Sequence, residues 1–73
     1  MLGLLLTIKE AREIEYLLKK EMEELLLDLE DERISGLVRR AMEERYKLLF
    51  NIYRRFVSSQ ESAKYAPKGF TQV

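Results

Sequence analysis

Two long segments with helical periodicity, separated by one short break, constrain this chain more than any other feature. Apolar residues recur at three- and four-residue steps over residues 8–30, in a segment without glycine or proline. A second periodic segment covers residues 36–57, and residues 31–35 are the only plausible break between the two. The sequence therefore predicts an all-α protein in which two long helices lie antiparallel.

Local signals mark where the predicted helices begin and end. Thr7 and Glu10 have the spacing of a capping box, in which each side chain accepts a hydrogen bond from the other residue's backbone amide. Ser58 and Glu61 repeat that spacing, and Pro67 follows. We expect a short third helix over residues 59–66, which completes a single domain over residues 1–66. Residues 67–73 are predicted to form a flexible C-terminal tail.

Two charged residues interrupt the apolar stripes and set the register of the hairpin. Glu21 lies in the stripe of the first helix and Arg45 in that of the second, and a turn near residue 33 places them opposite each other. We interpret them as a structural ion pair, because no second catalytic group accompanies them. If the pair is deeply buried, loss of one partner costs about 3–5 kcal/mol. The same register pairs Leu29 with Leu37, Leu25 with Ala41, Leu18 with Leu48, and Ile14 with Ile52.

The second helix is apolar over more of its circumference than one neighbouring helix can cover. We expect one face to pack on the first helix, formed by Leu37, Val38, Ala41, Leu48, Leu49, Ile52 and Phe56. A second row lies beside that face and comprises Tyr46, Phe50, Tyr53 and Val57. A wide apolar arc indicates burial on more than one side. We interpret this row, together with Tyr16 and Leu27 of the first helix, as the interface of a homodimer that forms a four-helix bundle. The third helix and the N-terminal leucines are the rival coverings.

Composition excludes much of enzyme chemistry. The 73 residues include neither cysteine nor histidine, so disulfides, thiolate metal sites and imidazole catalysis are absent. Glutamates one turn apart on the first helix lack the histidine partners that metal-binding bundles use. We therefore expect no catalytic residues, no cofactor and no metal. A chain of this size buries only about 60% of its unfolded surface, so association is the usual way to gain stability.

Charge distribution leaves nucleic-acid binding as the alternative function. The net charge is zero, but residues 1–33 carry 10 acidic and five basic residues, whereas residues 34–73 carry three and eight. A basic stripe on the second helix includes Arg40, Lys47 and Arg54, which could contact phosphates. Binding to phosphates would weaken steeply with salt, whereas an apolar interface would not. We favour packing of an acidic helix beside a basic one, within a chain or between chains.

The apolar N-terminal run, residues 1–6, is too short for a membrane span and lacks the basic residue that precedes a signal sequence. Its leucines leave peripheral membrane attachment as a third class of function. The sequence favours a cytoplasmic, non-enzymatic protein-interaction or regulatory module that self-associates or binds another protein.

Overall fold

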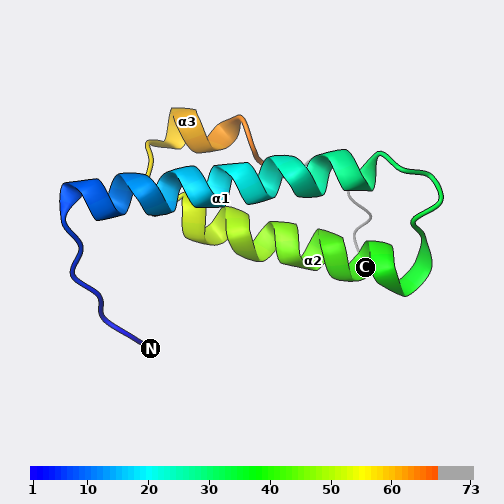
Figure 1. The fold of residues 1–73 in the computed structure, drawn as a ribbon, viewed down its shortest axis with the longest axis horizontal. Helices are drawn as coiled ribbons and strands as arrows, with labels where there is room; N and C mark the ends of the chain where they lie inside the picture. The colour runs from blue at the N-terminus through cyan, green and yellow to red at the C-terminus, as the bar shows by residue number, and fades with distance from the viewer. Residues whose placement is uncertain (68–73) are drawn as a thin grey trace.

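Two long antiparallel helices and one short helix form the protein (Figure 1). The computed structural model describes residues 1–67; residues 68–73, almost all of the tail that we expected to be flexible, lie outside the described residues. The helices are α1 (Ile8–Leu29), α2 (Gly36–Tyr53) and α3 (Ser59–Ala63). The described part of the chain contains no strand. The all-α prediction, with two long packed helices and a short third one, is therefore confirmed.

The N-terminus of α1 is held by the predicted capping box. The Glu10 backbone N–H donates to Thr7 Oγ1 over 3.1 Å, and the Thr7 backbone N–H donates to Glu10 Oε1 over 2.9 Å. At α3, the Glu61 N–H donates to Ser58 Oγ over 3.2 Å. Each bond satisfies a backbone donor that the first turn of a helix cannot pair internally.

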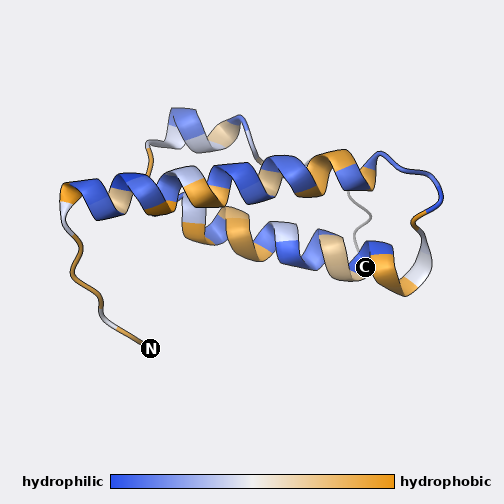
Figure 2. Cartoon of the chain, viewed as in Figure 1, coloured by the Kyte–Doolittle hydropathy of each residue, from blue (hydrophilic) through white to orange (hydrophobic). Residues whose placement is uncertain are grey.

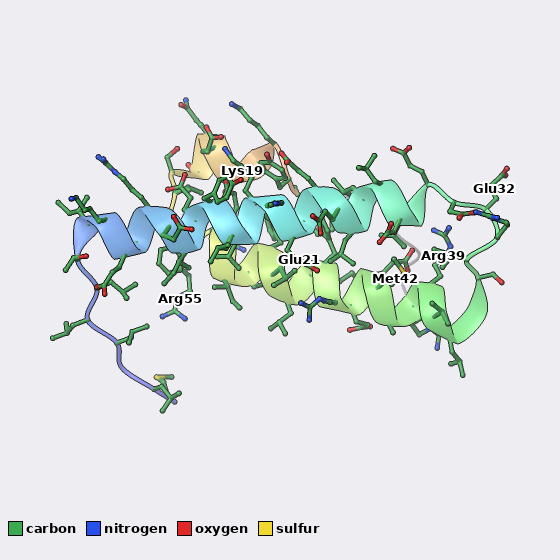
Figure 3. The ribbon with its side chains drawn as sticks, viewed as in Figure 1. Lys19, Glu21, Glu32, Arg39, Met42 and Arg55 are labelled. Carbon is green, nitrogen blue, oxygen red and sulfur yellow. The ribbon has the colours of Figure 1, made fainter. Side chains whose placement is uncertain are left out.

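One arginine fastens the turn between α1 and α2. The Arg39 guanidinium donates to the carbonyl oxygens of Leu29 over 2.8 Å, of Asp31 over 3.0 Å and of Ile34 over 2.9 Å. The Leu29 carbonyl lies at the end of α1 and the other two lie in the turn, so no helical N–H follows to pair with them. The Arg39 side chain is drawn in Figure 3 between the turn and the start of α2. The sequence pattern did not indicate this role for Arg39.

Gly36 begins α2 with a φ of +63°, a left-handed conformation that glycine adopts readily and other residues avoid. No atom lies within 4 Å of the position that a Cβ would take. Backbone conformation, and not crowding, is therefore the reason for glycine at the point where the chain turns into α2.

The face of α2 that packs on α1 differs from the predicted one. Tyr46 and Tyr53 are 1% and 0% exposed, whereas Leu37 and Leu48 are 82% and 60% exposed. The helix is therefore turned by about 100°, the angle between successive residues, from the orientation that the sequence suggested. The core comprises Met22, Leu25, Tyr46 and Tyr53, with Leu18, Met42, Leu49, Phe50, Val57 and Tyr65 packed against it.

Contacts from the C-terminal segment explain why the aromatic row turns inward. Tyr46 Oη donates to the Tyr65 carbonyl oxygen over 2.6 Å, and the rings of Tyr53 and Tyr65 meet edge to face at 5.4 Å. Tyr65 Oη donates to Glu23 Oε2 of α1 over 2.7 Å. The segment that carries α3 thus covers the aromatic row within the chain, which was one of the two rival coverings.

The predicted second helix ends four residues early, at Tyr53. The next residues form turns in which the Arg55 N–H donates to the Ile52 carbonyl and the Phe56 N–H donates to the Tyr53 carbonyl. These turns redirect the chain so that Val57 packs against the core. After these turns the chain continues into α3, which Figure 1 draws above α1.

Candidate functional site

The side of the hairpin away from α3 exposes a row of aliphatic residues, which we call the open face. Helix geometry places Glu21 and Glu23 on opposite flanks of α1, because side chains two residues apart on a helix point about 200° apart. Glu23 contacts Tyr65, while Glu21 pairs with Arg45. Figure 3 likewise draws Lys19 on the α3 side of α1 and Glu21 toward α2. The open face comprises Ile14, Leu17, Glu21 and Glu24 of α1 with Ala41, Arg45, Leu48 and Ile52 of α2.

The aliphatic members of the open face cluster beside the ion pair. Leu17 is 54% exposed and Leu48 is 60% exposed. Ile14 and Ile52 are half-buried beside them, one helical turn farther from the connection between α1 and α2. At the start of α2, Leu37 and Val38 are exposed as well, and Figure 2 shows hydrophobic colour at both ends of this helix. Contiguous exposed apolar side chains bordered by charges are typical of a protein-interaction surface.

The ion pair lies in this surface and not in the core. Arg45 Nε is 3.6 Å from Glu21 Oε2, and the two side chains are 57% and 40% exposed. The predicted pairing is thus confirmed, but the burial that would make it costly to break is not present. An exposed pair of this kind contributes about 0–1 kcal/mol.

The predicted interface residues lie in two separate places. Tyr46 and Tyr53 are buried in the core, and Phe50 and Val57 pack against it, so the fold leaves Tyr46 and Tyr53 no surface to offer a second chain. This corrects the interpretation of the aromatic row as a subunit interface. Tyr16 and Leu27 are 55% and 66% exposed, on the flank of α1 away from the open face. Tyr16 lines an open hollow there with Lys19, Lys20 and Glu23.

The residues proposed to contact phosphates are not equally accessible. Arg40 is exposed, whereas Lys47 is half-buried. The Arg54 guanidinium lies 5.9 Å from the centre of the Phe50 ring, a cation–π contact.

Perturbed ionisable groups cluster around the covered aromatic row. Burial raises the pKa of Tyr46, and burial with the nearby Glu61 carboxylate raises that of Tyr53. Burial and the hydrogen bond to Glu23 raise the pKa of Tyr65 strongly. These shifts keep the three hydroxyls protonated, and those of Tyr46 and Tyr65 act as hydrogen-bond donors. An acid–base catalyst, by contrast, needs a pKa near the working pH.

Other kinds of site find no support among residues 1–67. No group of three or more acidic residues is placed to hold a metal ion there. No described helix combines the length and apolar character that crossing a membrane requires. The N-terminal arm, residues 1–6, extends from the start of α1 and is hydrophobic in Figure 2, with Leu2 and Leu5 almost fully exposed.

The sequence identified aliphatic residues that form the open face, but it did not show that they point away from the core. Leu48 and Ile52 belong to the predicted packing face, and Leu17 adjoins the apolar stripe of α1. Comparison with protein-family models, with curated proteins and with solved structures finds no match to this chain.

Proposed function

We propose that this protein is a non-enzymatic helical interaction module that self-associates through the open face. The observation that carries the proposal is the exposure of Leu17 and Leu48 on adjacent helices, beside half-buried Ile14 and Ile52. Two such hairpins packed by these faces would form a four-helix bundle. The proposed interface is aliphatic and replaces the aromatic one that the sequence suggested.

Energetic considerations support association. The chain is 73 residues long and has no disulfide, so its own core is small. Among residues 1–67, the largest fully buried side chains are those of Met22, Tyr46 and Tyr53. Burial of a leucine that is otherwise exposed contributes about 1.5–3 kcal/mol, so several aliphatic residues at a dimer interface would add substantially to stability.

Sedimentation equilibrium of the full chain tests this proposal, with two matched variants. Leu48→Glu places a charge on the open face, and Leu27→Glu places the same charge at a leucine of similar exposure, 66% against 60%, on the other flank. We expect the wild type and Leu27→Glu to form dimers and Leu48→Glu to be a monomer of unchanged helix content. A wild-type monomer at all accessible concentrations would refute self-association, and a monomeric Leu27→Glu would place the interface on the Tyr16 flank.

A further inference from the structure

From the charges that border the open face we infer the arrangement of the two copies: α1 of each copy packs against α2 of the other. This inference rests on the proposed self-association and adds the orientation of the partner, which that proposal leaves open. It also gives the Glu21–Arg45 pair a role between chains.

Two-fold symmetry allows two ways to place one open face on another. An axis parallel to the helices sets α1 opposite α2 of the second copy, whereas an axis across the helices in the plane of the interface sets α1 opposite α1. The two arrangements bury similar aliphatic residues. Charge is therefore what distinguishes them.

The two helices differ in charge on the open side. Helical spacing places Glu10, Glu21, Glu24 and Asp28 of α1 on this side, at steps that keep to one half of the helix. On α2, Arg45 lies on the open face and Glu44 lies beside Leu48, so this side of α2 carries no net negative charge. An arrangement of α1 opposite α1 sets acidic rows against each other, and juxtaposed like charges disfavour a complex. Placing α1 opposite α2 of the second copy instead sets the acidic row of α1 against Arg45.

The register within one hairpin also fixes the register between copies. The ion pair sets Glu21 level with Arg45 along the hairpin axis. A two-fold axis parallel to the helices preserves that level, so Glu21 of each copy lies level with Arg45 of the other. Leu17 is one turn before Glu21 and Leu48 is one turn after Arg45, so Leu17 of one copy faces Leu48 of the second copy. Glu21 and Arg45 of both copies then lie at one level along the bundle axis, and Leu17 and Leu48 of both copies lie together one helical turn away.

Affinity and orientation have separate sources in this arrangement. Exposed ion pairs contribute little net affinity but set orientation and association rate. The leucine and isoleucine side chains supply the apolar area that drives association.

Site-specific cross-linking tests the arrangement, because the chain has no cysteine of its own. Leu17→Cys and Leu48→Cys are each prepared as full-length chains, confirmed as dimers by sedimentation, and treated with a short bismaleimide separately and as an equimolar mixture. We expect the covalent dimer with one chain of each kind to form faster in the mixture than either variant alone forms its own covalent dimer. A mixture of Leu27→Cys with Leu48→Cys serves as the control and should give little product.

Faster cross-linking of Leu17→Cys alone than of the mixture would overturn the arrangement in favour of α1 opposite α1. Dimers that sediment normally but give no mixed product would overturn it too, while leaving self-association in place. A chain that sediments as a monomer would refute the proposed function and this inference together.

A charge substitution gives an independent readout. Glu24→Gln removes an acid from the row that would face Arg45 of the second copy, so the dimer dissociation constant should rise about two- to fivefold at low salt. A fall in that constant would contradict the arrangement, because it would mean that relief of acid–acid repulsion had strengthened the dimer.

Discussion

Arg45 Nε and Glu21 Oε2 lie 3.6 Å apart on the open side of the hairpin, where both side chains remain substantially exposed. The pair therefore marks the register of α1 and α2 without anchoring the core. At concentrations that keep the chain monomeric, a double-mutant cycle of Glu21→Ala and Arg45→Met should give a coupling energy of about 0–1 kcal/mol. Urea unfolding of the four chains followed by circular dichroism measures it. A coupling of about 3 kcal/mol or more would mean that the pair is buried.

Arg39 should contribute more to stability than any other arginine of α2. Its guanidinium donates to three carbonyl oxygens at the end of α1 and in the following turn. Arg39→Ala should lower the free energy of unfolding by about 1–3 kcal/mol, because those acceptors lose charge-assisted hydrogen bonds. Its exposed neighbour provides the control: Arg40→Ala should change stability by no more than about 0.5 kcal/mol. Equal effects of the two substitutions in urea unfolding would count against the role assigned to Arg39.

Two buried tyrosines should respond in opposite directions to loss of the hydroxyl. Tyr46 Oη donates to the Tyr65 carbonyl, so Tyr46→Phe should destabilise the fold by about 1 kcal/mol. Tyr53 Oη is buried without a hydrogen-bond partner among the described residues, so Tyr53→Phe should be neutral or stabilising by up to about 1 kcal/mol. Thermal unfolding of both variants measures the difference. A loss of stability in Tyr53→Phe that matches Tyr46→Phe would show that Tyr53 Oη does have a partner.

Alkaline pH should destabilise the protein through its covered tyrosines. The pKa values of Tyr46, Tyr53 and Tyr65 are raised above the ordinary 10.0, chiefly by burial. The unfolded chain then loses these protons at lower pH than the folded chain, so stability is complete below about pH 10 and falls as pH rises further. Urea unfolding between pH 8 and 11 should show this decline.

The variant Tyr65→Phe isolates part of that alkaline loss. It removes the hydroxyl that donates to Glu23, so it should lower stability at pH 8 and flatten the decline above pH 10. An unchanged slope would assign the alkaline loss to groups other than Tyr65.

Local features of the fold were predictable from the sequence. The capping box at Thr7 and Glu10 involves residues three apart, so composition and spacing determine it. The register of the hairpin was equally predictable, because only one pair of opposite charges interrupts the two apolar stripes. These signals depend on near neighbours or on a single coincidence of spacing.

The orientation of α2 was not predictable, because both of its candidate faces are apolar. The choice depends on Tyr65, which contacts Tyr46 and Tyr53 from 19 and 12 residues away along the chain. Aromatic side chains bury about 150–250 Å² each. Burial of this row under the C-terminal segment therefore stabilises the fold more than burial of the aliphatic face would. The role of Arg39 was also hidden, since its acceptors are backbone carbonyls that any sequence supplies.

The most direct test of this orientation compares an aspartate on each side of α2. Circular dichroism of Leu48→Asp and Tyr53→Asp, at a concentration that keeps the chain monomeric, reports whether each variant folds. Leu48 is 60% exposed and Tyr53 is 0% exposed, so we predict that Leu48→Asp keeps its helix content whereas Tyr53→Asp unfolds, because a carboxylate without a partner cannot be buried at acceptable cost. The reverse result, an unfolded Leu48→Asp beside a folded Tyr53→Asp, would contradict the open aliphatic face and everything proposed for it.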